Sequence, residues 1–155
     1  MKKITKSELI SILECVQAGS FMTLYVETYP EMRKTNNPFI GVKKKQSMHV
    51  EFNCSYAKKM EKELQKTDQH FAVSGAKWGE HLGKKFVEHK DNFYIKVMPK
   101  SITLIEYNYN GNKISEESII PFLKDKPKVL VEFRMINIDN IKKLQFLGEL
   151  FEVVE

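Results

Sequence analysis

The stretch FYIKVMPKSITLIEYNY, residues 93–109, decides the fold class, because residues typical of β-strands dominate it. Residues 93–98 and 102–109 predict two strands, and the Pro-Lys-Ser segment at 99–101 predicts a hairpin turn between them. The sequence NYNGNK around Gly111 predicts another turn directly afterwards. This part of the chain is therefore expected to form a β-meander.

Further strands are predicted on both sides of this stretch. Residues 21–28 are rich in β-formers, and Met48, Val50 and Phe52 alternate with polar residues, as in a half-buried strand. After the meander, a short helix or turn is predicted from Ser115 to near Pro121 or Leu123, and a turn at Ile138 and Ile141. The remaining predicted strands are residues 129–135, 144–147 and 150–154, with a bend at Gly148.

The chain begins with the pattern of an amphipathic helix. Thr5 and Glu8 have the spacing of a capping box, and Gly19 is a stop signal. The apolar positions share one helical face: Leu9, Ile10, Ile12, Leu13 and Val16. A second, short charged helix is predicted over residues 56–65.

These elements predict an α+β fold in a single domain, 1–155, with the N-terminal helix packed on a bent antiparallel sheet. Short strands with glycine bends suit an OB-like small barrel, and an open sheet suits the same pattern nearly as well. The connection between the two strands at 21–28 and 48–52 is long and basic, at about 29–47, and holds Pro30 and Pro38. Long connections in compact domains are usually functional or mobile.

Composition indicates a cytoplasmic globular protein, with 42% hydrophobic and 29% charged residues. No apolar run reaches membrane-spanning length, and the N-terminus lacks the apolar core of a secretion signal. Cys15 and Cys54 have no metal or redox spacing and are expected to be two buried free thiols in a reducing cytosol rather than a disulfide. We predict no membrane association, no cofactor and no metal.

The excess positive charge lies in one segment. Between Met32 and Lys62, eight Lys or Arg residues stand against two acids, whereas the segments before and after it carry net charges of −1 and 0. Such a local excess of positive charge favours a polyanion as partner, because neutralising phosphates releases condensed counterions.

The basic loop contains the side chains expected to bind this partner. Arginine and lysine would hold phosphates, whereas the hydroxyl and amides would bond phosphate, sugar or base edges. The predicted polar binding residues are Arg33, Lys34, Thr35, Asn36, Asn37, Lys43, Lys44 and Lys45. Aromatic residues interleave with these charges, and bases stack on exposed rings. The predicted stacking residues are Tyr29, Phe39, Tyr56 and Trp78, whereas Phe52 is expected in the core.

Patterns typical of enzymes are weak in this chain. The Gly- and Lys-rich segment 75–85 lacks the spacing and the hydroxyl of a nucleoside-triphosphate loop, and Trp78 within it is also typical of a loop anchor in the core. The four histidines have no zinc-ligand spacing, and no nucleophile motif is found. We predict a non-enzymatic protein, with a nuclease as the enzymatic alternative.

Several segments together resemble a family of small uncharacterised tailed-phage proteins. The similarity rests on the loop Pro30, Met32, Arg33, Lys34, Thr35, Asn37, Pro38 and Phe39, on Trp78-Gly79, on Glu132-Phe133-Arg134 and on Gly148-Glu149-Leu150-Phe151. The resemblance implies a phage-encoded protein that acts in the cytosol of a host bacterium. It implies no catalytic residue.

The predicted function is binding of single-stranded nucleic acid, DNA or RNA, because 23 lysines and only two arginines suit backbone attraction better than base reading in a duplex. The alternative is an interaction or counter-defence protein that binds a host protein or a small phosphorylated nucleotide signal. The two predictions differ in shape: a strand needs a groove with exposed rings, whereas a nucleotide needs a closed anionic pocket.

Overall fold

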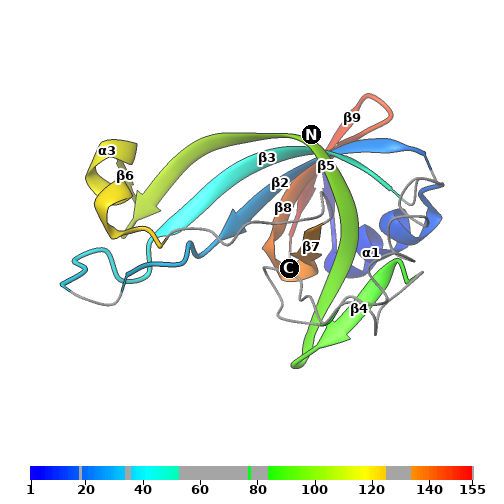
Figure 1. Ribbon diagram of the computed structural model, residues 1–155. Helices are drawn as coiled ribbons and strands as arrows, with labels where there is room; N and C mark the ends of the chain where they lie inside the picture. Colours follow the sequence, from blue (N-terminus) through cyan, green and yellow to red (C-terminus); the bar gives the residue numbers. More distant parts are fainter. Residues whose placement is uncertain (18, 34–35, 53–76, 78–83, 125–133, 155) are drawn as a thin grey trace.

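The computed structural model describes residues 1–17, 19–33, 36–52, 77, 84–124 and 134–154. Over these residues the chain forms a sheet-rich α+β fold with two short α-helices (Figure 1). The elements are β1 (Lys2–Ile4), α1 (Lys6–Cys15), β2 (Phe21–Thr28), β3 (Lys43–Glu51), β4 (Phe86–His89), β5 (Asn92–Tyr109), β6 (Asn112–Ile114), α3 (Glu116–Ile119), the 3-10 turn η2 (Ile120–Phe122), β7 (Arg134–Asn137), the 3-10 turn η3 (Ile138–Asn140), β8 (Ile141–Phe146) and β9 (Glu149–Val153). The predicted helix at 56–65 and the residues Cys54, Tyr56 and Trp78 lie outside the described residues.

The strands form one mixed sheet rather than a purely antiparallel one. Its order is β1-β9-β8-β2-β3-β5-β4, and β6 and β7 add to β5 beyond this path. The pairing of β1 with β9 is parallel, whereas the other pairs are antiparallel. Among the described strands no pairing joins β1 to β4, so the sheet is not closed into a barrel. The sequence carried no signal for β1, which is three residues long.

The predicted hairpin turn at 99–101 is wrong, because β5 continues through it as one strand of 18 residues. The register against β3 shifts between His49 and Val50, which face Ser101 and Pro99, so Lys100 is an extra residue in a bulge. A proline is tolerated at a bulge, where its missing N–H interrupts no regular ladder, and the bulge bends the strand. Figure 1 shows the result, with β5 sweeping from the end that holds β4 to the end that holds β6 and α3.

Two predicted turns are confirmed. Asn110 and Gly111 join β5 to β6, with φ angles of 51° and 83°, and Leu147 and Gly148 join β8 to β9, with φ angles of 52° and 78°. Two consecutive residues with positive φ form the tight turn whose twist matches a two-residue hairpin, and glycine adopts this conformation without strain.

The predicted N-terminal helix and its capping box are confirmed. The Glu8 amide donates to the Thr5 hydroxyl and the Thr5 amide donates to the Glu8 carboxylate, both at 3.1 Å. Leu9 and Leu13 are fully buried, but Cys15 is exposed, which corrects the expectation of a buried thiol. The reason is helical geometry, since a residue two positions after Leu13 points to the opposite side.

A long-range contact closes the other end of this helix. The Lys85 ammonium donates to the carbonyl oxygens of Glu14 and Val16 at 3.1 and 2.8 Å, which satisfies two of the acceptors that a helix C-terminus leaves open. Burial lowers the pKa of Lys85, whereas the neighbouring Cys15 and Glu14 oppose this shift.

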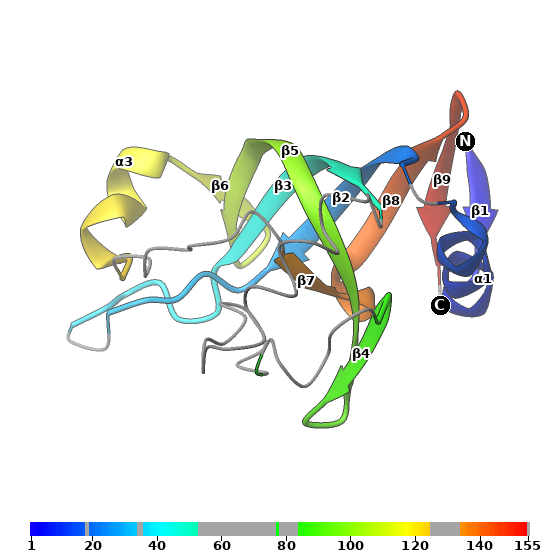
Figure 2. The same ribbon diagram turned by 45° about the vertical axis from the view of Figure 1, so that its right-hand side comes forward.

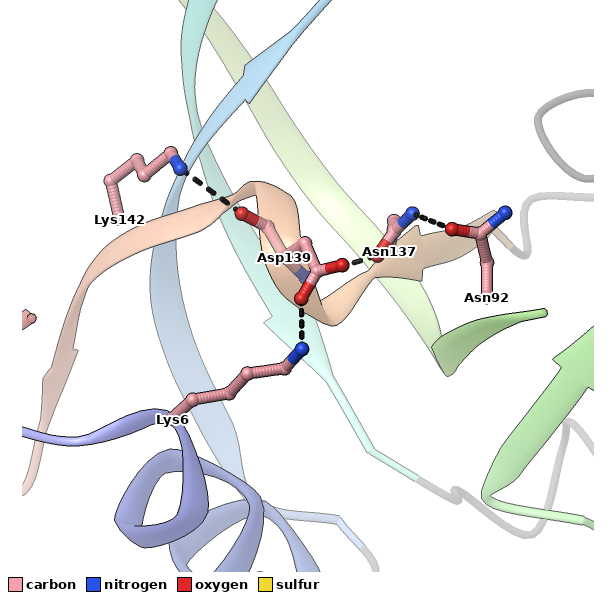
Figure 3. A network of polar contacts seen from close by, with 5 residues as sticks. All are labelled: Lys6, Asn92, Asn137, Asp139 and Lys142. Carbon is pink, nitrogen blue, oxygen red and sulfur yellow. Dashed lines mark hydrogen bonds and ion pairs between the residues drawn. The ribbon is translucent and has the colours of Figure 1, made fainter. Parts of the chain in front are cut away.

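A polar network links the helix to three parts of the sheet (Figure 3). Lys6 at the start of α1 forms an ion pair with Asp139 in η3, and Lys142 in β8 donates to the Asp139 carbonyl at 3.1 Å. Asn137 accepts from the Asp139 amide at 3.0 Å and donates to Asn92 at the start of β5 at 3.2 Å. The network therefore joins α1 and η3 to the strands β5, β7 and β8.

The molecule has a main core and a smaller cluster at one end. The main core includes residues from α1, β2, β3, β5, β8 and β9, with Leu9, Leu24, Val50, Ile95 and Leu144 all fully buried. The smaller cluster is formed by Val42, Tyr107 and Ile119, which lie where β3, β5 and α3 meet. Figure 2 shows this end as a projection that carries β6 and α3, away from α1.

Candidate nucleic-acid interface

The ribbon formed by β2 and β3 has one buried face and one partly exposed face. On β2, Met22, Leu24 and Val26 are at most 2% exposed and belong to the main core. The alternate residues point to the opposite side, because successive side chains of a strand alternate between faces. We call this opposite side of β2, β3 and their neighbours the outer face; on β2 it carries Phe21, Thr23, Tyr25 and Glu27.

The strand register shows which side chains share the outer face. Direct cross-strand partners lie on the same side of a sheet. The outer-face pairs of β2 and β3 are Phe21 with Glu51, Thr23 with His49, Tyr25 with Ser47, and Glu27 with Lys45. On the other side of β2, Tyr25 faces Lys143 and Thr23 faces Gln145 of β8.

The Phe21 and His49 rings form a stacked pair on this face. Their centroids lie 5.3 Å apart and their planes differ by 8°. Thr23 Oγ1 lies 3.3 Å from His49 Nδ1, at hydrogen-bond distance, so the imidazole is held from two sides. Phe21 is still 45% exposed and His49 is exposed. A flat aromatic surface that is already held in place is thus open to solvent.

Further rings follow on the same strand at regular spacing. Tyr25 is half-buried four residues after Phe21, and Tyr29 is 69% exposed four residues further on, just after the end of β2. Lys43 is exposed at the start of β3, next to the last register pair of Thr28 with Lys44. The outer face therefore leads from the Phe21 ring to the exposed Tyr29 and Lys43 at the base of the basic loop.

The three consecutive lysines do not act as one cluster. Lys45 lies 3.6 Å from Glu27 and 3.9 Å from Glu106, so two carboxylates compete for its charge. Lys44 lies on the other face, with its ammonium 6.0 Å from the centre of the Tyr107 ring. Of the predicted lysine track, Lys43 makes no ion pair with any described residue.

Burial affects the tyrosine beneath Lys44. Tyr107 is 4% exposed in the smaller cluster. Burial raises the pKa of the Tyr107 hydroxyl, and the nearby Glu116 carboxylate adds to this increase. The role of Tyr107 is therefore to pack in the smaller cluster.

The loop preceding β3 is held by its own contacts and by η2. The Arg33 amide donates to the Phe122 carbonyl at 2.7 Å, while the Arg33 side chain is exposed. The Asn37 side chain accepts from the Phe39 amide at 2.9 Å, so it shapes the loop. Phe39 packs edge-on against Tyr109 and Phe122, at centroid distances of 5.6 and 5.7 Å.

The predicted binding residues therefore separate into several groups. Arg33, Asn36, Lys43 and Tyr29 are exposed, whereas Phe39 and Asn37 are half-buried and serve the loop itself. Lys34, Thr35, Tyr56 and Trp78 lie outside the described residues. The loop is also shorter than the predicted 29–47, because the three lysines already belong to β3, which begins at Lys43. The prediction of Phe52 as core is confirmed by its 0% exposure.

The outer-face residues of β2 and β8 were missed as a site by sequence reasoning. The alternation in residues 21–28 was a usable signal, since apolar even positions imply that Phe21 and Tyr25 point outwards. The position of Gln145 and Lys143 beside them had no local signal, because it depends on the pairing of β8 with β2.

Comparisons with protein-family models, curated proteins and solved structures each find no match for this chain. Among the described residues no group of three or more His, Cys, Asp and Glu side chains could hold a metal ion. None of the helices in the described part of the chain has the length and apolar character needed to cross a membrane.

Proposed function

We propose that this protein binds single-stranded nucleic acid without catalysis, through the outer face and the adjoining base of the loop. The observation that carries the proposal is the series of aromatic rings at every fourth residue, with Phe21 and Tyr25 on the outer face of β2 and the exposed Tyr29 just after its end. Stacking of Phe21 on His49 enlarges the first ring into a two-ring platform.

The spacing of the rings suits an extended strand. Four residues of β-strand span about 13 Å, which is the spacing of Phe21 and Tyr25 along β2, and Tyr29 follows just after the end of the strand. Each base that stacks on an aromatic side chain contributes about 1–3 kcal/mol, and every base has a face that can stack. A duplex hides these faces between its base pairs, so the platform favours unpaired bases.

Cations at the loop end supply the phosphate contacts. Arg33 and Lys43 are exposed, and Lys143 stands beside Tyr25 in the register. Two or three neutralised phosphates give a salt dependence of roughly −1.4 to −2 log units of affinity per log unit of salt. Near the loop end, Lys45 stands against the two carboxylates of Glu27 and Glu106, a net charge of −1, so stacking contributes the larger part of the binding energy there.

The test is a titration of the protein with a fluorescent oligothymidine of about ten nucleotides, followed by anisotropy at several salt concentrations. Phe21→Ala and Tyr25→Ala are each expected to weaken binding about tenfold, since each removes a stacking surface. Leu147→Ala is the matched control, because Leu147 is 86% exposed at the β8–β9 turn and its loss should leave the affinity unchanged.

A parallel titration with a cyclic dinucleotide addresses the alternative ligand. A strand-binding face predicts that the oligonucleotide binds more tightly than the dinucleotide, because it reaches more rings. An affinity that does not change with salt, or a dinucleotide that outcompetes the oligonucleotide, would reject the proposal.

A further inference from the structure

We infer that two copies of this chain pair edge to edge through β5 and form a dimer with one continuous sheet. The inference stands apart from the proposed function, because it concerns an edge of the sheet and not a ligand on the outer face. Its basis is an open stretch of strand edge, residues 100–106, whose sequence is complementary to itself in antiparallel orientation.

The middle of β5 has a strand on only one side. β3 pairs with residues 98–108, and β6 pairs with residues 107–109 on the opposite edge, since Tyr107 has a partner in both strands. The other two partners of β5, β4 and β7, reach only residues 92–97. Figure 1 shows β5 as the outermost strand along this stretch, with β3, β2 and β8 on the same side of it. Among the described strands, none therefore covers the second edge between 98 and 106.

This edge is also open to solvent. Residues 100–103 are all exposed, and Ile105 is 47% exposed. An unpaired edge presents a row of backbone N–H and C=O groups, which is a template for another strand. Ile102 is 37% exposed although it lies opposite Met48, which is buried in the main core. A strand added at this edge would cover the apolar surface of Ile102.

Two bulges limit the stretch that can pair. Lys100 and Ile105 are extra residues that have no counterpart in the register of β3. Bulges twist an edge away from further strands, so regular pairing is confined to residues 101–104 between them. A short edge with fixed ends favours one specific partner over open aggregation.

In antiparallel orientation this stretch is complementary to itself. When Thr103 faces Thr103 of the second copy, Ile102 faces Leu104 of that copy, because antiparallel partners lie at equal distances from the centre of the pairing. Lys100 then faces Glu106 of the second copy. Each of these two unlike pairs occurs twice around the two-fold axis. Apolar pairs, opposite charges and threonine pairs all stabilise adjacent strands.

The same register keeps matching side chains on the same side of the sheet. Ile102 and Leu104 are opposite Met48 and Gln46 of β3, which are both buried, so the two apolar residues lie on the inner side. Thr103 is opposite Ser47, which belongs to the outer face. The apolar contacts of the dimer therefore form on the inner side and the threonine pair on the outer face.

The charges at the two ends of the stretch both reach towards the outer face. The Lys100 ammonium lies 3.8 Å from the Glu51 carboxylate, and the Glu106 carboxylate lies 3.9 Å from the Lys45 ammonium. Glu51 and Lys45 are outer-face residues in the register with β2. The Lys100 side chain is still 43% exposed, so its charge is accessible to Glu106 of the second copy.

A dimer of this kind closes on itself. The two-fold axis uses the same edge of both copies, so this edge offers no free strand to a third copy. The outer faces of the two copies lie on the same side of the continuous sheet, because direct cross-strand partners share a side.

The test is sedimentation velocity of the full chain between about 1 and 300 μM, since a contact of a few residues belongs to the small, weak class of interfaces. We expect a monomer–dimer equilibrium with a dissociation constant of about 10 μM. Lys100→Glu should weaken the dimer about tenfold, because two pairs of like charges then face each other. Lys3→Glu is the matched control, since Lys3 is exposed on β1 at the far edge of the sheet and the net charge changes equally. Its dissociation constant should stay as in the wild type.

A charge swap separates pairing from other effects of these substitutions. Glu106→Lys alone should weaken the dimer as Lys100→Glu does, for the same reason. The double variant Lys100→Glu with Glu106→Lys should restore the wild-type dissociation constant, because opposite charges face each other again. A double variant that dimerises no more tightly than the single variants would contradict the register.

Two further outcomes would overturn the inference. One is a wild type that stays monomeric at about 300 μM, which would leave the edge to a strand of another protein. The other is a dimer that Lys100→Glu weakens no more than Lys3→Glu does. None of these results depends on the oligothymidine titration, so the dimer and the proposed function succeed or fail separately.

Discussion

The two faces of the β2–β3 ribbon differ completely, although their residues alternate along the same two strands. The inner face holds Met22, Leu24 and Val50, which are at most 1% exposed and pack in the main core. The outer face holds exposed rings and hydrogen-bonding side chains, with Phe21 stacked on His49. The inner side chains are explained by packing, whereas packing does not require an exposed phenylalanine at position 21.

In a fold of this kind, residues that bind a ligand are expected on the face that core packing does not constrain. Inner-face side chains are constrained by close packing, and their replacement chiefly changes the free energy of unfolding. Outer-face side chains are nearly free of that constraint, so the residues found there can serve a ligand. The two kinds of replacement are therefore expected to affect different measurements.

The largest expected effect comes from the inner face. Leu24→Ala removes a fully buried side chain and should lower the free energy of unfolding by about 2–5 kcal/mol, through lost burial and the cavity that remains. Urea denaturation followed by circular dichroism measures this loss. Thr23→Ala, one residue away on the outer face, should cost less than about 1 kcal/mol. Equal losses for the two variants would contradict the division between the faces.

An intermediate effect comes from the charges of the outer face. Glu27→Gln combined with Glu106→Gln removes both acidic partners of Lys45 and frees its ammonium for a phosphate. The slope of affinity against salt should become steeper by roughly 0.7, and affinity should rise several-fold at low salt. Stability should change by no more than about 1 kcal/mol, because these ion pairs are still partly exposed, and their 3.6 and 3.9 Å distances are long.

The matched control for this charge change is Glu88→Gln with Glu117→Gln. Both residues are exposed, on β4 and α3, and the pair changes the net charge by the same amount. If the control steepens the salt slope equally, the effect comes from net charge and not from Lys45.

The smallest expected effect is a pH dependence of the free energy of unfolding, caused by the buried Tyr107. Because burial and Glu116 raise the pKa of Tyr107, the folded state favours the neutral phenol. This contribution to stability is complete below about pH 10, where unfolded tyrosine titrates, and is lost as pH rises through the higher folded pKa. Urea denaturation between pH 9 and 11 should therefore show a steeper loss for the wild type than for Tyr107→Phe.

The variant Glu116→Gln tests independently that the pKa of Tyr107 is raised in the folded state. Removing the carboxylate takes away one cause of the raised pKa, so the alkaline loss of stability should be smaller and end at lower pH than in the wild type, with the same onset near the pKa of unfolded tyrosine. If the free energy of unfolding falls equally with pH in the wild type and in Tyr107→Phe, the Tyr107 phenol does not contribute to the alkaline loss of stability.

Local patterns predicted several elements closely. The helix cap at Thr5 and Glu8 is confirmed, because both partners of a capping box lie within one turn. The strand at 21–28 has the predicted bounds, and the Gly111 and Gly148 turns are where two positive φ angles are needed. All of these depend on residues only a few positions apart.

Predictions that depended on distant partners were less successful. Pro99 was interpreted as a turn, but the pairing of β3 along β5 makes it part of a bent strand. Lys43–Lys45 were placed in the loop, but their pairing with β2 and β5 makes them the first residues of β3. In both cases inter-strand hydrogen bonds overrode the local preference.

The candidate site shows the same division. The sequence alone determined a localised positive charge, the alternation that turns Phe21 and Tyr25 away from the core, and the capped first helix, since each follows from neighbouring residue types. Three features required the folded chain: β8 lies beside β2, Gln145 and His49 flank Thr23 in one row, and Lys44 and Lys45 point to opposite faces. The physical reason is that register between strands is set by the packing of the whole inner face, so residues far apart in the chain become neighbours only when the core has formed.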